Sequence, residues 1–148
     1  MRTPEEVREA VVQSWIESAR DDLAWAEMGA SATSLRGIAQ IGFHAQQAVE
    51  KLLKAVLASF DVVPEEHHDL ARLLAQVRLL DRSTADSLPA IAHLTRYAAQ
   101  YRYPPRPGRS HGLVRSDVLA DLLSAREACR LLETALAERL ARLRTHES

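Results

Sequence analysis

Apolar residues recur at steps of three or four along most of the chain, which is the spacing of an amphipathic α-helix. The pattern is widest in residues 34–60, where no proline interrupts it. One stripe of this segment contains Ile38, Ile41, Ala45, Ala48, Val49, Leu52, Leu53, Val56 and Phe60. A stripe of this width suits a helix that has neighbours on more than one side. We therefore expect a long central helix around which the other elements pack.

Helical spacing also marks four other segments. They are residues 4–28, residues 70–80, residues 89–101 and a last segment from 116 or 117 to 143. Thr3 is placed to cap the first helix, Pro4 to begin it and Gly29 to stop it. A short polar turn ending at Ser34 then predicts that the first two helices are antiparallel neighbours. Asp69 is placed to cap the helix over residues 70–80.

The first and last helices each have one expected buried stripe. In the first helix the stripe contains Val7, Val11, Trp15, Ala19, Leu23 and Ala26. In the last it contains Val118, Leu122, Ala125, Cys129, Leu132, Leu136, Leu140 and Leu143. The alternation of a strand and internal repeats are both absent from the sequence. We predict an all-α, up-and-down helical bundle of four main helices plus a short helix, in one domain over residues 1–148 with its core at about 4–143.

The composition limits which cellular compartment and which cofactors we expect for the protein. A lone Cys129 excludes an internal disulfide and a cysteine zinc cluster, which favours a reducing compartment. The N-terminus is acidic, and no run approaches the roughly 18 apolar residues of a membrane span, so we expect a cytoplasmic protein without membrane contact. Residues 65–69 are Glu-Glu-His-His-Asp, but their spacing matches no zinc signature and favours a polar turn. We expect no metal and no cofactor.

Residues 87–116 carry no acidic side chain, although the whole chain has a formal charge of −1. The stretch has a local charge of +5 from Arg96, Arg102, Arg106, Arg109 and Arg115, and it also holds His93, His111 and the tyrosines Tyr97, Tyr101 and Tyr103. Guanidinium groups for phosphates, interleaved with rings that stack on bases, are typical of RNA or nucleotide binding. The alternative is a loop solvated by arginine, with tyrosines that pack the end of the bundle.

Within this stretch, three prolines in residues 103–108 predict an irregular loop. Arg106 and His111 lie close together on it. Such a pair can cleave RNA without metal, because the imidazole takes the proton of the ribose 2′-OH while the guanidinium stabilises charge on the phosphorane. The spacing alone is weak evidence, and the sequence shows neither a glycine-rich phosphate loop nor a Ser/His/Asp pattern in a recognisable context.

The expected central helix carries a polar face, made of Gln47, Glu50, Lys51 and Lys54. Such a face is either solvated or a partner surface. Phe43 and Trp25 would remain partly in water in a monomer, which favours a dimer. We therefore predict an interface that contains Phe43, Gln47, Lys51 and Lys54. For His44, beside this face, a role in surface or interface polarity is favoured over catalysis.

Four segments together give the chain a resemblance to a known family. They are residues 15–26, residues 43–55 with the sequence FHAQQAVEKLLKA, residues 68–70 (His-Asp-Leu) and residues 101–104 (Tyr-Arg-Tyr-Pro). In this order they resemble the landmarks of the HEPN domains (higher eukaryotes and prokaryotes nucleotide-binding), and the match covers nearly the whole chain. The second segment is the most specific, and the others are short and supportive.

The resemblance implies a bundle of four main helices plus a short one. It also implies a homodimer, often encoded beside a minimal nucleotidyltransferase in toxin–antitoxin modules. Some members of the family are metal-independent endoribonucleases, with a motif of Arg, four to six residues and then His. Arg106 and His111 satisfy this spacing, although Pro107 stands where the family usually has a polar residue. Eight residues separate Arg102, which matches the family at 101–104, from His111.

Two functions of different classes follow. The first is the RNA- or nucleotide-binding component of a toxin–antitoxin module, which binds through Arg102, Tyr103, Arg106, Arg109 and Arg115. In its enzymatic form it would cleave RNA with Arg106, His111 and Arg102. The second is a non-catalytic dimeric helical module, an adaptor for a nucleotidyltransferase or another partner. The proline-rich loop favours binding over cleavage, because catalysis needs charged groups that are held in place before the reaction.

Overall fold

The computed structural model describes residues 1–32, 37–101 and 103–145. Within these ranges the chain forms six α-helices and one short 3-10 helix, and no strand. The long helices are α1 (Pro4–Ser31), α2 (Ile38–Ser59) and α6 (Arg115–Thr145). The short ones are α3 (Leu70–Leu80), α4 (Arg82–Ser87), the 3-10 helix η1 (Ala92–Leu94) and α5 (Thr95–Ala99). The predicted all-α bundle is confirmed.

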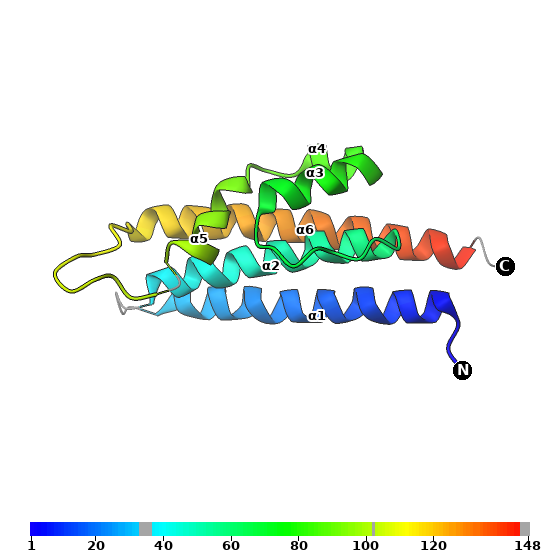
Figure 1. Ribbon diagram of the computed structural model, residues 1–148, viewed down its shortest axis with the longest axis horizontal. Coiled ribbons are helices and arrows are strands. Elements are labelled where there is room, and N and C mark those ends of the chain that lie inside the picture. The colour runs from blue at the N-terminus through cyan, green and yellow to red at the C-terminus, as the bar shows by residue number, and fades with distance from the viewer. Residues whose placement is uncertain (33–36, 102, 146–148) are drawn as a thin grey trace.

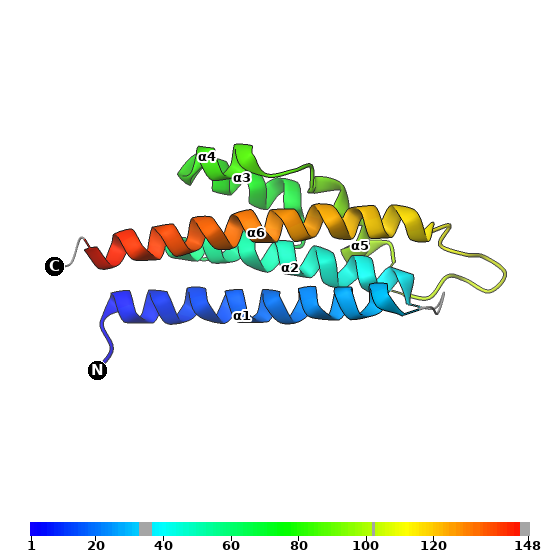
Figure 2. The same cartoon turned by 180° about the vertical axis from the view of Figure 1, so that it is seen from behind.

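The three long helices lie side by side, and α2 packs along both α1 and α6. The short helices α3 and α4 lie on the side of the bundle away from α1 (Figures 1 and 2). Residues 103–114, which lead into α6 and which we call loop 103–114, project from the end of the bundle where α1 ends and α2 begins (Figure 1). The loop and the start of α2 are therefore neighbours in space.

The helix α2 is the central helix that the sequence predicts. Seven positions of its expected stripe are buried, while Ile38 and Phe60 at its two ends are half-buried. Gly42 is also buried, and a Cβ built there would lie 2.2 Å from Cδ1 of Tyr97. The glycine is thus required for the close approach of the Tyr97 ring to the α2 backbone. Residues 33–36, which include the end of the expected polar turn at Ser34, lie outside the described part of the chain.

The N-terminus of α1 forms as its sequence predicts. The Thr3 hydroxyl accepts the backbone N–H of Glu6, and the Glu6 carboxylate accepts the backbone N–H of Thr3. The expected buried stripe is partly wrong, because Val7 and Val11 are 48% and 44% exposed. Ala19 and Ala26 of the stripe are buried, Trp15 and Leu23 are half-buried, and the helix also buries Val12, Ile16 and Asp22. The buried face is therefore rotated away from Val7 and Val11, which remain in solvent.

Gly29 does not stop α1, which continues to Ser31. A Cβ at Gly29 would lie 2.9 Å from Cγ1 of Ile41, so the glycine permits close packing of α1 on α2. The end of the helix is held by another element, because the Arg115 guanidinium donates to the carbonyl oxygens of Ala30 and Ala32 at 2.7 and 2.9 Å. An arginine from α6 thus caps the last carbonyls of α1.

The chain between α2 and α6 departs most from the prediction. The helix Leu70–Leu80 and its cap Asp69 are confirmed. Asp81 then ends α3 and also caps the unpredicted helix α4, since its carboxylate accepts the backbone N–H of Thr84. The helix expected over residues 89–101 is replaced by η1 and α5. Pro89 favours extended geometry at Leu88, whose ψ is 144°, which suits the end of α4 at Ser87.

The last helix, α6, closely follows its predicted stripe. Val118, Leu122, Ala125, Cys129, Leu132 and Leu136 are buried, and Leu140 is half-buried. Burial raises the pKa of the Cys129 thiol to about 12, so this cysteine is an apolar filler of the core. Among the described residues, none of the helices is long and apolar enough to cross a membrane.

Candidate functional site

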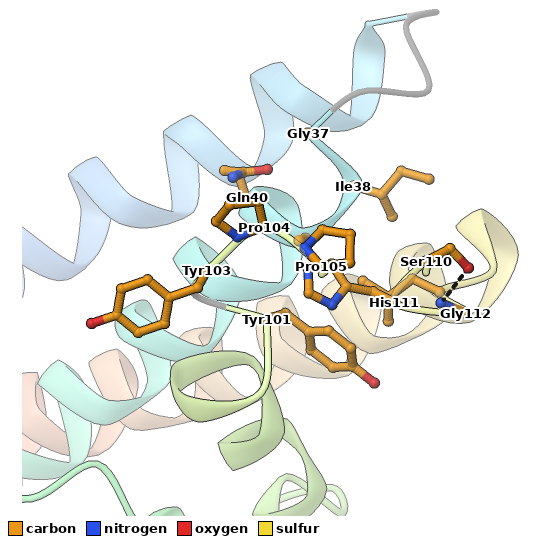
Figure 3. A pocket seen from close by; sticks show the side chains of 12 residues that line it. Gly37, Ile38, Gln40, Tyr101, Tyr103, Pro104, Pro105, Ser110, His111 and Gly112 are labelled. Carbon is orange, nitrogen blue, oxygen red and sulfur yellow. Dashed lines mark hydrogen bonds between the residues drawn. The ribbon is translucent and has the colours of Figure 1, made fainter. Parts of the chain in front are cut away.

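A pocket with a volume of about 680 Å³ lies where loop 103–114 meets the beginning of α2. The side of α2 contributes Gly37, Ile38, Ala39 and Gln40, and the other side contributes Tyr101, Tyr103, Pro104, Pro105, Ser110, His111, Gly112 and Leu113 (Figure 3). The prolines keep this part of the loop extended. The pocket is thus built from the segment that the sequence predicts to carry the chemistry.

His111 lines this pocket, and its side chain is partly shielded from solvent. The His111 ring meets the Tyr101 ring edge to face, with centroids 5.3 Å apart and an interplanar angle of 89°. Tyr101 in turn packs on the buried Tyr97, at 5.6 Å between centroids. A ladder of rings therefore connects His111 to the bundle core, and the structure places this predicted residue in a cavity.

Arg106 and Arg109 lie at the tip of the loop, and both are exposed. The backbone N–H of Arg109 donates to the carbonyl of Arg106 at 2.9 Å, and Gly108 between them has a φ of 77° that favours glycine. Within the described part of the chain, neither arginine lines the pocket. The structure thus does not bring Arg106 together with His111. Arg102, the other predicted arginine, lies outside the described residues.

The remaining basic residues of the acid-free stretch have partners inside the fold. Nη2 of Arg115 donates to the carbonyls at the end of α1, and the role of Arg115 in RNA binding stays a prediction. Arg96 donates to Asp121 at 2.6 Å and to the Tyr97 hydroxyl at 3.1 Å. The stretch is therefore not one continuous cationic surface, although Tyr103, 72% exposed, remains available for stacking.

The carboxylate of Asp121, in α6, contacts Tyr97, Arg96 and His93, and none of these contacts was predicted from the sequence. Its carboxylate accepts from the Tyr97 hydroxyl and from Arg96, each at 2.6 Å, and lies 2.8 Å from Nε2 of His93. Burial acts to raise the pKa of Asp121, but the hydrogen bonds from Tyr97, His93 and Arg96 outweigh it and hold the pKa below its usual value. Burial and this carboxylate together raise the pKa of Tyr97 to about 12.

Another polar cluster lies on the face of α2 that was expected to be solvated or to meet a partner. Glu50 is 3% exposed and Lys54 is 8% exposed, and their side chains pair at 2.8 Å. Gln46 also donates to Glu50 at 2.8 Å, and Nδ1 of His68 lies 3.1 Å from both carboxylate oxygens. Burial acts to raise the pKa of Glu50, but these hydrogen bonds outweigh it and lower the pKa.

Lys51 and His44 extend this polar surface toward α1. Lys51 donates to Asp22 at 2.5 Å and to the Ser18 hydroxyl at 2.8 Å, while Nδ1 of His44 lies 2.8 Å from the other Asp22 oxygen. We call the polar residues His44, Gln46, Gln47, Glu50, Lys51 and Lys54 the polar row of α2. Most side chains of the row form hydrogen bonds within the chain, and Phe43 and Gln47 are half-buried. A dimer interface there stays a prediction.

A signal for the two missed carboxylates is present in the sequence. Asp22 follows Ala19 and precedes Ala26 at helical steps, and Asp121 lies between Val118 and Ala125 in the same way. An acidic residue at core spacing must be buried with donors around it, because an unpaired buried charge is costly. Such a position predicts a hydrogen-bonded cluster, although not the identity of its partners.

A comparison with protein families supports the resemblance seen in the sequence. The chain matches the family model described as HEPN domain over residues 12–139. This span begins within α1, ends within α6 and includes the pocket, the polar row of α2 and Asp121. Comparisons with curated proteins and with solved structures find no match. Since the family model covers well over half of the chain, the chain belongs to the HEPN domain family.

Proposed function

We propose that this HEPN-domain protein binds RNA or nucleotides with the pocket beside loop 103–114. The observation that carries the proposal is one cavity walled by Tyr101 and His111, next to a loop tip with two exposed arginines, Arg106 and Arg109. The rings can stack on bases, and the guanidinium groups can contact phosphates. Because loop 103–114 contains no carboxylate, nothing on it opposes the approach of an anion.

The same pocket supports cleavage of RNA without a metal. His111 at the wall can take the proton of a ribose 2′-OH, which then attacks the adjacent phosphate. Arg106, or Arg102, would stabilise the negative charge of the phosphorane. Since Arg106 does not line the pocket, a bound phosphate has to draw its side chain inward. Binding is therefore the better supported half of this proposal.

A cleavage assay tests the enzymatic half. We expect the purified protein to cut single-stranded RNA in the presence of EDTA and to leave 2′,3′-cyclic phosphate ends. His111→Ala should slow cleavage by about 10²-fold or more, which is the usual loss for a general acid or base. A control is His68→Ala, because His68 does not line the pocket. RNA that is bound but never cut, with the biological effect of His111→Ala unchanged, would leave only a binding or adaptor function.

We propose further that the protein is one half of a toxin–antitoxin-type module whose other half is a minimal nucleotidyltransferase. This proposal comes from the family and from no contact in the structure. An adjacent reading frame with the Gly-Ser and paired-Asp pattern of a nucleotidyltransferase would support it. Co-purification of the two proteins would test the partnership directly, and two separate species in every preparation would contradict it.

The alternative is a non-catalytic dimeric adaptor, which an exposed stripe on α1 favours. Val7 and Val11 near the start of α1, and Trp25 and Met28 near its end, lie on one side of the helix and are 44% to 63% exposed. Exposed apolar side chains that share one side of a helix are typical of an interaction surface. A homodimer that covers this stripe also explains why Trp25 is left in solvent within one chain.

Light scattering tests the dimer. We expect a mass of about twice 16.5 kDa at micromolar concentration, because the apolar stripe is then covered. Trp25→Arg should shift the protein toward the monomer, since it places a charge in the stripe. Leu123→Arg is the matched control, because Leu123 is a similarly exposed apolar residue on α6. A single species near 16.5 kDa in the unmodified protein would exclude the dimer.

A further inference from the structure

A second, smaller hollow of about 280 Å³ adjoins the pocket. It is lined by Ala39, Gln40, Phe43, His44 and Tyr101. Ala39, Gln40 and Tyr101 also line the larger pocket, so the two hollows are neighbours at the first turns of α2, and we call the two together the groove. His44 lines the smaller hollow and His111 the larger. The groove therefore carries one histidine in each half, with Tyr101 common to both.

The His44 ring is held in a defined orientation. Its Nδ1 lies 2.8 Å from Oδ1 of Asp22, and Lys51 holds the other oxygen of this carboxylate at 2.5 Å. The Trp25 ring stacks along one side at 6.4 Å between centroids, and the Phe43 ring meets it edge-on at 5.4 Å. With Nδ1 bonded to Asp22, Nε2 is the nitrogen left for a ligand in the hollow.

We propose that His44 is a second catalytic residue, which donates a proton to the leaving oxygen of a single-stranded RNA bound in this groove. The inference rests on the proposed RNA cleavage at His111. That step needs both a group that removes a proton and a group that supplies one. The groove provides two imidazoles for these tasks in one chain. His44 therefore has a chemical role in addition to the surface polarity that its sequence context favours.

The reaction is a transesterification. The 2′-oxygen gives its proton to His111 and forms a bond to phosphorus. The bond from phosphorus to the 5′-oxygen of the next nucleotide breaks, and that oxygen leaves with the electron pair and takes the proton from Nε2 of His44. The products are a 2′,3′-cyclic phosphate and a free 5′-hydroxyl, and no oxidant, reductant or further reactant is consumed. Asp22 suits His44 to this role, because its contact with Nδ1 holds the ring in one orientation and leaves Nε2 for the leaving oxygen.

A purely structural role is the competing explanation, since histidine–carboxylate pairs also occur elsewhere in this fold. Nδ1 of His68 pairs with Glu50 at 3.1 Å, through the same ring nitrogen that His44 uses. His68 lines neither half of the groove. Removal of a histidine–carboxylate pair should therefore act alike at both positions, whereas removal of an acid catalyst should appear only at His44.

The test compares two substrates. His44→Asn keeps an N–H donor for Asp22 but offers no acid in the place of Nε2. We expect it to cleave oligouridine about 10²-fold more slowly than the unmodified protein. On uridine 3′-(4-nitrophenyl phosphate), whose leaving group needs no proton, it should keep the unmodified rate. His111→Ala should lose activity on both substrates, and His68→Asn, the matched control, on neither.

Several outcomes would overturn the role of His44. An equal loss on both substrates, or full activity of His44→Asn on oligouridine, removes the acid role and leaves the proposed function intact. An unmodified protein that cleaves neither substrate overturns this inference together with the proposed cleavage. If thermal unfolding shows that His44→Asn does not fold, His44→Gln takes its place, because Gln also lacks an acid and is judged by the same two rates.

Discussion

The polar row of α2 and loop 103–114 meet at one groove, yet they hold their polar residues in different ways. His44, in the row, is hydrogen-bonded at 2.8 Å to the buried Asp22, whereas the ring of His111, in the loop, meets the ring of Tyr101 edge to face. A hydrogen bond to a carboxylate fixes both the ring position and the protonated nitrogen, while a ring contact fixes only the position. The row is thus preorganised, and the loop keeps its cations free for a ligand.

The polar row and loop 103–114 also differ in how much they contribute to the free energy of unfolding. Glu50 is almost fully buried, so its charge is tolerated only because Lys54, Gln46 and His68 surround it. Arg106 and Arg109 are solvated and contribute little to folding. Substitutions at Glu50 and Lys54 should therefore act mainly on stability, and substitutions at Arg106 and Arg109 mainly on binding.

The largest effect is expected from Glu50→Gln. It removes the charge that pairs with Lys54 and leaves an uncompensated ammonium that is 8% exposed. Breaking a buried ion pair in this way lowers the free energy of unfolding by about 3–5 kcal/mol. Urea unfolding followed by circular dichroism measures it.

The matched control is Glu127→Gln, because Glu127 pairs with Arg130 on the exposed side of α6. We expect no measurable change in its unfolding midpoint, since exposed ion pairs contribute little. Similar midpoints for the two variants would show that the polar row is not the stabilising region of the molecule.

A smaller effect on the free energy of unfolding is expected at acidic pH. The pKa values of Glu50 and Asp121 are lowered in the folded protein, from ordinary values of 4.5 and 3.8. Below about pH 4.5 the unfolded chain therefore binds more protons than the folded chain, and the free energy of unfolding falls as the pH falls. The contribution of both carboxylates is complete above their ordinary pKa values and is lost as the pH drops through the lowered ones. Unfolding midpoints between pH 3 and pH 6 measure this slope.

Glu50→Gln tests how much of this pH dependence comes from Glu50. The variant lacks one of the carboxyl groups whose pKa is lowered in the folded protein, so its stability should depend less steeply on pH in this range. An identical slope in the variant and the unmodified protein would show that other carboxylates govern the acid transition.

The sequence predicted the three long helices well, and for α2 and α6 it also predicted the buried side, because their stripes are wide enough to define it. The stripes of α2 and α6 and the cap at Asp69 are local signals, and the structure confirms them. The end of α1 could not be predicted locally, since its last carbonyls are bound by Arg115 from a distant part of the chain. The division of residues 82–99 into short helices depends on packing against α2 and α6, which no local pattern encodes.

For the candidate site, the sequence identified a segment that lines the pocket but not which arginines are free. Arg96 and Arg106 look alike in a sequence, yet one is bound to Asp121, 25 residues away in the chain, and the other is exposed. Long-range partners of this kind depend on the fold. The position of His44 next to the pocket also depends on the fold, since the residues that line both hollows come from α2 and from Tyr101.

The smallest effect on stability, and the clearest effect on binding, is expected from the double variant Arg106→Ala and Arg109→Ala. Both side chains are exposed, so the free energy of unfolding should change by less than about 0.5 kcal/mol. RNA affinity should fall, and the slope of log affinity against log salt should become shallower by about 0.7 for each phosphate that the variant no longer neutralises. Arg130→Ala, an exposed arginine on α6, is the control and should keep the unmodified slope. Fluorescence anisotropy with single-stranded RNA at several salt concentrations measures both quantities. An unchanged slope in the double variant would mean that the loop does not bind the phosphates, and the contrast between a stabilising row and a ligand-binding loop would then fail.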